Sequence, residues 1–311
     1  MNSLHEGVTE YLELRRSLGF RLKKDELYLR DFADFMARRH VMHITAKLAV
    51  RWARQPASTD ANYLAGRLRA VRSFARYRIL SDPRTEIPAT DLLPRRRSAF
   101  QPHIFSEEEI RRILTGSLRQ RGGATRFYCL GRYTIYGLLS VTGMRVGEVL
   151  NLDLGDVDLD QGVITIRNAK FGKSRLVPVH ETTRTALRRY REERDVFLAG
   201  RVAKPFFISS LGCRIVHTAL DRAFRRLTKR LGMRGASEST GPRLHDLRHS
   251  MAVEVLRQCY RSGADPERRL PALSTYLGHT HLNYTYWYLH QNPGLMTEAV
   301  ARLQHRWQAP A

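Results

Sequence analysis

An arginine and a glutamate three residues apart stand where a helix is expected to begin. The segment TGMRVGEVLNL, residues 142–152, places Arg145 and Glu148 at positions i and i+3, shortly after Gly143. An arginine at such a start can present its guanidinium to a phosphate, with nearby backbone N–H groups assisting, and the glutamate can orient it. Taken alone, the pair is more often an ordinary surface ion pair, so both interpretations stay open.

A second candidate lies on a predicted β-hairpin. GVITIRN and SRLVPVH alternate as strands do, around AKFGK, in which Gly172 makes the turn. Lys170 and Lys173 are two of only seven lysines in a chain whose other bases are arginines. Lysine, unlike arginine, offers a transferable proton. A solvated hairpin tip is the alternative interpretation.

The third candidate is LHDLRHS, residues 244–250. His245 and Arg248 are at i and i+3, so one helical face carries an imidazole and a guanidinium. Such a pair suits holding a phosphate and moving a proton beside it. A packed histidine next to a surface arginine, with His249 on a neighbouring face, is the alternative.

The fourth candidate is LGHTHLNYTYWYLH, residues 277–290. Gly278 indicates a turn that exposes His279, and Tyr288 follows nine residues later. A tyrosine-rich helix is more often core or stacking surface than nucleophile. Tyr284 and Tyr286 are the other tyrosines in reach.

The order and spacing of these four segments resemble the tyrosine recombinases, the phage-integrase and Xer-like site-specific DNA recombinases. The pattern is R-x-x-E, a hairpin lysine, H-x-x-R, then L-G-H with a tyrosine nine residues on. The resemblance covers residues 142–290 in motif and 1–141 in general layout. It implies six catalytic positions, which are Arg145, Lys170, His245, Arg248, His279 and Tyr288.

The resemblance also implies a chemistry for the arginines and the nucleophile. Arg145 and Arg248 would brace the non-bridging oxygens of a phosphodiester and stabilise the charge of the transition state. Tyr288 would attack and later leave, because tyrosine forms a stable phenolate. The product is a 3′-phosphotyrosyl link that a 5′-hydroxyl of another strand can resolve.

Proton transfer falls to the remaining positions. By the same resemblance Lys170, with Lys173 as the alternative, would protonate the departing 5′-oxygen. His245 would assist proton transfer at the tyrosine, and His279 would hold a phosphate oxygen. No metal and no other cofactor is expected, since cationic side chains take the place of a metal. The 31 residues from Arg248 to His279 exceed the spacing of compact members, and we expect the extra stretch, near residues 261–273, to lengthen a loop.

Composition agrees with a polyanionic partner. The 311 residues hold 53 Lys+Arg against 30 Asp+Glu, a net charge of +23. Such an excess indicates nucleic acid or an anionic surface. No apolar run is long enough to span a bilayer, and no secretory signal is evident. Three well-separated cysteines form no disulfide framework, so a cytoplasmic, nucleoid-associated bacterial protein is expected.

The N-terminal part is predicted to be helical. TEYLELRRSLGF and DELYLRDFADFMARRH carry apolar residues at helical spacing, the second with Asp25 as N-cap and Leu27, Phe32, Phe35 and Met36 on its apolar side. The next clear helix is DANYLAGRLRAVRSFARYRIL. Its arginines Arg69, Arg72 and Arg76 share a face, and residues 61–80 contain no acid, which favours phosphate contact over a solvated surface.

These elements form two predicted domains. Residues 1–93 make a helical DNA-binding domain, which the resemblance identifies as core-binding and SAM-like. Residues 94–104 are a basic, proline-containing linker, and 105–311 are the catalytic domain. Ser106 and Glu109 predict a capping box at its first helix. The expected fold class is mainly α with a small β-hairpin or sheet, a helical N-terminal domain beside an α+β catalytic domain.

The expected partner is double-stranded DNA at specific recombination sites, clamped by both domains. Lys173 and Arg175 on the hairpin are expected to contact DNA. Relatives act as tetramers, so a homo-tetramer, or a hetero-tetramer with related recombinases, is implied. Three rivals stay open: a type IB topoisomerase-like enzyme, a catalytically silent DNA-binding module, and a histidine-ligated metal hydrolase. The last lacks HExxH and any acid-rich ligand set.

Overall fold

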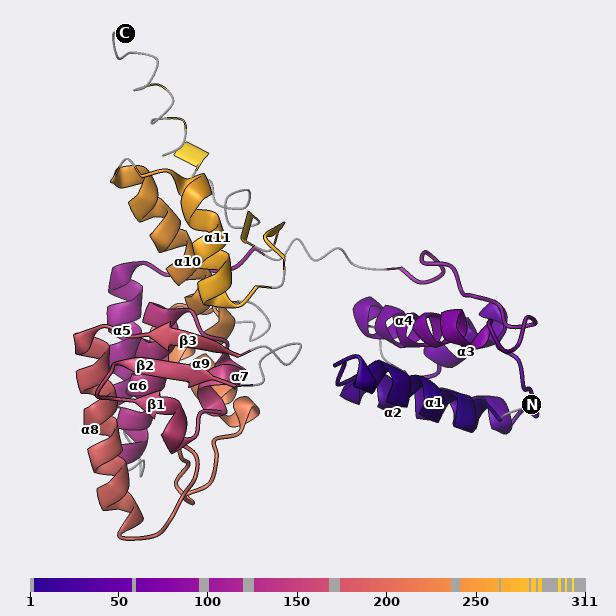
Figure 1. Ribbon diagram of the computed structural model, residues 1–311, viewed down its shortest axis with the longest axis horizontal. Coiled ribbons are helices and arrows are strands. Elements are labelled where there is room, and N and C mark those ends of the chain that lie inside the picture. The colour runs from indigo at the N-terminus through magenta and orange to yellow at the C-terminus, as the bar shows by residue number, and fades with distance from the viewer. Residues whose placement is uncertain are drawn as a thin grey trace. The chain divides into compact units, whose positions relative to one another are not determined.

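A computed structural model gives the fold of the chain (Figure 1). It describes residues 3–57, 60–94, 101–119, 126–167, 174–235, 241–262, 264–279, 281–283, 285–286, 296–297, 300 and 304. Two compact units divide the chain, residues 1–100 and 101–311. Within the residues placed by the structure, no helix is both long and apolar enough to cross a bilayer.

The first unit is a small bundle of helices. Its described elements are α1 (Leu4–Ser17), α2 (Lys23–Ala37), α3 (Ala46–Ala53) and α4 (Ala61–Arg78). Their apolar faces meet in one core around Phe32, Phe74 and Trp52. Side-chain caps define where three of the helices begin: Ser3 forms a capping box with Glu6, and Thr45 and Asp60 cap α3 and α4.

Three details of this unit differ from the sequence prediction. The N-cap of α2 is Leu22, in the left-handed region, and Asp25 lies inside the first turn. Leu27 is 70% exposed, on the outer side of α2, whereas Phe32, Phe35 and Met36 are buried as predicted. The short helix α3 was not singled out.

The second unit is mostly helical around a small sheet. Its described helices are α5 (Glu107–Leu118), α6 (Arg126–Thr142), α7 (Val146–Leu150), α8 (Glu181–Leu198), α9 (His217–Arg230), α10 (Leu244–Arg261) and α11 (Pro266–Leu277), with the 3-10 turn η1 (Leu154–Asp156). The Ser106–Glu109 capping box at the start of α5 is confirmed. The mainly helical fold class is therefore confirmed.

The predicted hairpin is present and belongs to a three-stranded antiparallel sheet. Strands β2 (Val163–Ile166) and β3 (Arg175–Pro178) pair with Ile166 opposite Arg175, and β1 (Val157–Asp158) pairs with β2 on the other side. Residues 168–173, with the predicted turn, lie outside the described residues. β1 was not predicted, because a two-residue strand carries no alternation.

The stretch expected to lengthen a loop instead forms most of helix α11. Asp265 caps α11, and Pro266 stands at its first position, where the missing N–H of proline costs nothing. Pro271 lies inside the helix and has no N–H to donate to the carbonyl four residues earlier. That carbonyl is in the exposed first turn of α11, where water can replace the missing donor. α11 packs against α10 through its own small core and ends at Gly278, in the left-handed region. It therefore delivers residue 279 at a defined place.

Candidate active site

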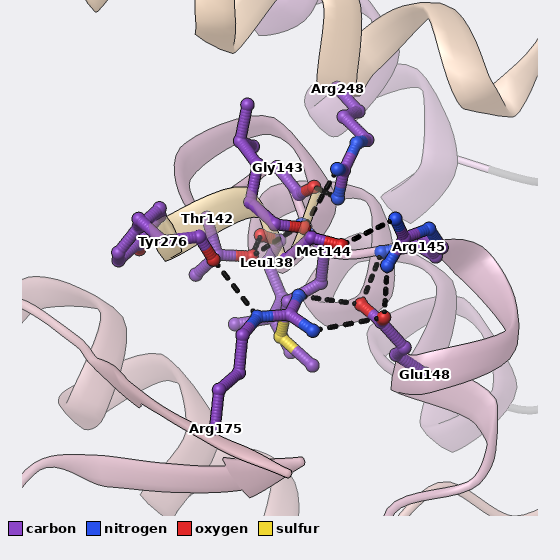
Figure 2. Close-up of polar contacts among 11 residues, drawn as sticks. Leu138, Thr142, Gly143, Met144, Arg145, Glu148, Arg175, Arg248 and Tyr276 are labelled. Atoms are coloured by element: carbon purple, nitrogen blue, oxygen red, sulfur yellow. Dashed lines mark hydrogen bonds and ion pairs between the residues drawn. The ribbon is translucent and has the colours of Figure 1, made fainter. Parts of the chain in front are cut away.

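The site begins at the turn between α6 and α7, where Gly143 has a positive φ. Arg145 is the N-cap of α7 and Glu148 is its third residue, so the two close a capping box. The backbone N–H of Arg145 donates to Oε2 of Glu148 at 2.9 Å, and Nη1 donates to Oε1 at 2.7 Å (Figure 2). The pair is not a surface ion pair, because the Glu148 side chain is only 7% exposed.

A third charged side chain enters this pair from the sheet. Arg175, the first residue of β3, donates from Nη1 to Oε1 of Glu148 at 3.0 Å and from Nη2 to Oε2 at 2.8 Å. Its Nε donates to the carbonyl oxygen of Tyr276 at 2.9 Å (Figure 2). With its side chain 12% exposed, Arg175 is largely enclosed by protein groups, and the DNA contact expected from its hairpin position stays a prediction.

Helix α10 contributes Arg248, whose guanidinium is buried. Its Nη1 donates to the carbonyl oxygen of Gly143 at 2.6 Å, and its Nη2 donates to that of Leu277 at 2.7 Å. Arg145 in turn donates from Nη2 to the carbonyl oxygen of Gly278 at 2.9 Å. Three arginines from three different elements thus bind three consecutive carbonyls at the end of α11.

Those carbonyls are natural acceptors for cations. The last carbonyl groups of a helix have no intrahelical partner, and the helix macrodipole places partial negative charge there. Gly278 closes the turn in the left-handed region, which frees the carbonyls of residues 276–278 for the arginines. A Cβ at Gly278 would lie 2.7 Å from Nη1 of Arg175, so the close approach requires glycine.

The electrostatics keep the only carboxylate of this network ionised. Burial raises the pKa of Glu148, but hydrogen bonds from Arg175 and Arg145 outweigh that effect and lower the pKa to about 2. Among the contacts of the described residues, the guanidinium groups of Arg145 and Arg175 therefore share one carboxylate, and that of Arg248 lies nearby on the carbonyls of Gly143 and Leu277. The arrangement carries excess positive charge, which suits an anionic group such as a phosphate.

The two predicted histidines, His245 and His279, and a third, His249, are close to this cluster. His245, in the first turn of α10, lies at the surface, and its ring makes an edge-to-face contact with that of His249, with centroids 4.8 Å apart. His279 follows Gly278 directly, and its Nδ1 pairs with the hydroxyl of Thr285 at 2.8 Å. The described residues bring no group of three or more metal-binding side chains together.

All three histidines favour the neutral form. Although part of the His245 ring is exposed, partial desolvation by the surrounding protein and then the charge of Arg248 lower its pKa. Burial and the arginines 248, 145 and 175 lower the pKa of His279 to about 4, and burial lowers that of His249 to about 3. A neutral imidazole has one donor and one acceptor nitrogen, so each ring can accept a proton as well as hold a phosphate oxygen.

Four of the six predicted catalytic residues are therefore found at one site. These are Arg145, His245, Arg248 and His279. Lys170 and Tyr288 lie outside the described residues, as do Lys173 and Tyr284. Tyr286 is described and packs against the α10–α11 core.

The three arginines predicted on the N-terminal helix all lie on α4, with different surroundings. Arg72 donates from Nε and Nη2 to the carbonyl oxygens of Pro88 and Ala89, both at 2.6 Å. Arg69 is exposed and lies 3.9 Å from a carboxylate oxygen of Asp25. Arg76 is exposed. Contact with DNA stays a prediction for all three.

Sequence reasoning did not find the partners of Arg175 or the role of the α11 carbonyls. Arg175 was selected only because it lies on the hairpin. Its distance along the chain from Glu148 and Tyr276 hides both contacts. Asp246, buried and hydrogen-bonded to the backbone N–H of Arg243, was also missed, although an acid three residues after a helix start is a recognisable capping signal.

This combination is typical of one class of enzyme: an arginine cluster lies beside histidines, at the end of the helix that leads to a tyrosine-rich segment. The class is the site-specific DNA recombinases of the tyrosine type. Residues 104–294 match the phage integrase family, and the chain belongs to that family.

Known proteins resemble the chain over most of its length. It is 46% identical over 316 residues to y4rB of Sinorhizobium fredii, a proposed integrase/recombinase, with 99% of each chain covered. It is 29% identical over 260 residues to the tyrosine recombinase XerC of Chlorobaculum tepidum, covering 78% of this chain and 73% of that one.

Two solved structures share the fold. The XerA recombinase is 26% identical with a TM-score of 0.51, over 98% of this chain and 99% of that one. A lambda integrase tetramer bound to a Holliday junction is 17% identical with a TM-score of 0.59, over 90% of this chain and 78% of that one.

Proposed function

We propose that the chain integrates or recombines a mobile DNA element, with Tyr288 as the nucleophile and the arginine cluster as its phosphate clamp. The observation that carries the proposal is the meeting of Arg145, Arg248 and His279 at one turn, directly before the tyrosine-rich segment. That turn would place the scissile phosphate between the guanidinium groups and the attacking phenol.

The proposed reaction has two phosphoryl-transfer steps. The Tyr288 oxygen attacks the scissile phosphorus, its proton passes to a base, and His245 is the described group suited to receive it because its imidazole is neutral. The bond from phosphorus to the 5′-oxygen breaks, and Lys170 supplies the proton for that oxygen. The 3′-phosphotyrosyl bond then yields to a 5′-hydroxyl of another strand, and the tyrosine is released.

The arginines would supply the charge stabilisation. The pentacovalent transition state holds more negative charge on its non-bridging oxygens than the starting diester does. Arg145 and Arg248 are both fixed by backbone carbonyls beside the place proposed for those oxygens. Fixed donors aimed at developing charge need little reorganisation when the reaction occurs.

Assembly on DNA is part of the proposal. The family neighbour that forms a tetramer on a Holliday junction supports a homo-tetramer, or a hetero-tetramer with related recombinases, on double-stranded DNA. Met296 and Val300, both about half exposed, come from a C-terminal segment with an apolar repeat that could pack on a neighbouring copy. The unit of residues 1–93 would hold DNA together with the catalytic unit, in the bacterial cytoplasm and nucleoid.

Replacing the proposed nucleophile tests this function. A nicked suicide duplex, carrying the end sequence of the element that encodes the chain, traps the covalent intermediate. In excess EDTA the wild-type chain should give a protein–DNA band on a denaturing gel. Tyr288→Phe should abolish the band and leave DNA binding unchanged, because only the attacking oxygen is lost.

Tyr286→Phe is the matched control and should keep the band. If Tyr286→Phe removes the band and Tyr288→Phe keeps it, the nucleophile is misassigned. A recombinant or Holliday-junction product from two sites distinguishes a recombinase from an enzyme that only relaxes DNA. Loss of cleavage on chelation, restored by a divalent ion, would contradict the metal-free mechanism.

A further inference from the structure

We infer that Arg175 is a positioning residue for the phosphate clamp, acting through Glu148 and the end of α11 rather than by touching DNA. The inference rests on the proposed function and deepens it. Its first support is the number of contacts. All three nitrogens of the guanidinium are bound: two to the oxygens of Glu148, and one to the carbonyl oxygen of Tyr276.

The second support is what those partners hold in turn. The two oxygens of Glu148 also accept the backbone N–H and Nη1 of Arg145. The turn that begins at Tyr276 continues to Leu277 and Gly278, whose carbonyls hold Arg248 and Arg145. Arg175 is thus linked to Arg145 through Glu148, and to both Arg145 and Arg248 through the turn at residues 276–278.

The third support is electrostatic. Without Arg175, the buried carboxylate of Glu148 would keep, among the residues that the structure describes, the guanidinium and backbone N–H of Arg145 as its hydrogen-bond partners. It would then draw that guanidinium more strongly toward itself and away from a phosphate. The bidentate pair with Arg175 fills the remaining acceptor positions of the carboxylate, since a carboxylate offers about four of them. Arg145 is left with donors to spare.

The fourth support is the space kept for Arg175. Its guanidinium lies where a Cβ of residue 278 would be, within 2.7 Å. On β3, Arg175 pairs with Ile166 of the neighbouring strand, so the sheet fixes its backbone. The side chain therefore spans from the sheet to the end of α11 and joins the hairpin to the segment that leads to His279 (Figure 2).

Single-turnover cleavage of the suicide duplex at saturating DNA tests this role. Arg175→Gln should slow cleavage by about 10- to 100-fold, as loss of a group that orients another functional group does. Affinity for the duplex should not change, because Arg175 makes no DNA contact. Arg167→Gln, directly after the neighbouring strand β2, removes an exposed guanidinium that pairs with the buried Asp156, and it should leave the rate unchanged.

A neutral substrate separates positioning from folding. Once wild-type cleavage has mapped the scissile phosphate, that phosphate is replaced by a methylphosphonate, which lacks one negative charge. Because the reacting group then carries less negative charge, misplaced guanidinium groups should slow its cleavage less. The rate deficit of Arg175→Gln, like that of Arg145→Gln, should shrink markedly on the methylphosphonate. Arg175→Lys keeps the charge but not the fork, so it should show the same pattern, and it carries the test if the glutamine variant does not fold.

Three results would overturn the inference. A deficit equal on both substrates would assign Arg175 to folding alone. Weaker DNA binding with a normal rate at saturation would assign it to DNA contact, as its hairpin position suggested. A normal rate and affinity would remove any role. Failure of the wild-type chain to form the covalent band would instead count against the proposed function, so the two failures are distinguishable.

Discussion

The two units of the chain use arginine in opposite ways. In the N-terminal unit the buried Arg67 lies over the ring of Trp52, 3.9 Å from its centroid, and donates to Asp31 at 2.9 Å. This one guanidinium therefore contacts one carboxylate and one aromatic ring face. In the catalytic unit Arg145, Arg175 and Arg248 gather around Glu148 and one helix end.

The comparison indicates that the balance of charge, more than the number of arginines, distinguishes the proposed phosphate site from a packing contact. Arg67 is matched by its carboxylate and by the π-face of Trp52, and it serves packing. In the catalytic unit, Arg145 and Arg175 share the carboxylate of Glu148 among the contacts of the described residues, and an excess of buried positive charge costs free energy unless an anion binds. The surplus is what we expect a bound phosphodiester to neutralise.

The largest expected effect comes from removing a member of the surplus. Arg248→Ala should lower the single-turnover cleavage rate by about 10²- to 10³-fold, the usual cost of losing one donor to a developing oxyanion. The measurement is covalent-complex formation at saturating DNA. A loss confined to DNA affinity, with a normal rate, would mean that Arg248 stabilises the ground state only.

The matched arginine of the N-terminal unit should behave differently. Arg67→Met keeps most of the aliphatic stem but loses the contacts to Asp31 and to the Trp52 ring. Because Asp31 is half exposed, we expect a fall of about 2 kcal/mol in the free energy of unfolding of this unit, less than for a fully buried pair. Urea denaturation of the chain checks it. An unchanged unfolding curve would show that the pair contributes nothing, and cleavage under folding conditions should be normal.

The smallest effect is expected at an exposed arginine of α4. Arg76→Ala should leave stability unchanged and reduce the slope of log affinity against log salt by about one, the effect of one lost phosphate contact. Binding measured at several salt concentrations decides this. If the slope is the same as in the wild-type chain, Arg76 faces solvent and not DNA.

Much of the fold and half of the site could be predicted because their signals are local. The Ser106–Glu109 capping box, the alternation of β2 and β3, and the i, i+3 pairs Arg145–Glu148 and His245–Arg248 each lie within a few residues. Tertiary structure was not needed to recognise them. The prediction of Asp25 as N-cap was wrong because aspartate is favourable at two kinds of position. It caps a helix, and it also stabilises the first turn from inside, near the positive end of the macrodipole.

The rest depends on contacts that the sequence does not show. Whether Arg145–Glu148 is a surface pair or a buried one is decided by Arg175, which comes from a strand 27 residues away. The stretch near residues 261–273 was expected to lengthen a loop, but Pro266 starts helix α11 and Pro271 lies within it. No local pattern reports that the end of this helix will accept three guanidinium groups.

The three carbonyls at the end of α11 also determine at which stage the arginine side chains lose their rotamer entropy. An arginine side chain free in solution carries about 2 kcal/mol of rotamer entropy, which must be given up when its fork is fixed on a ligand. Here Arg145, Arg175 and Arg248 are already fixed by the carbonyls of Gly278, Tyr276 and Leu277, respectively. The loss is part of folding and is compensated by the packing of the whole unit. A phosphate that arrives meets donors that are already ordered, so more of the binding energy is available for the transition state.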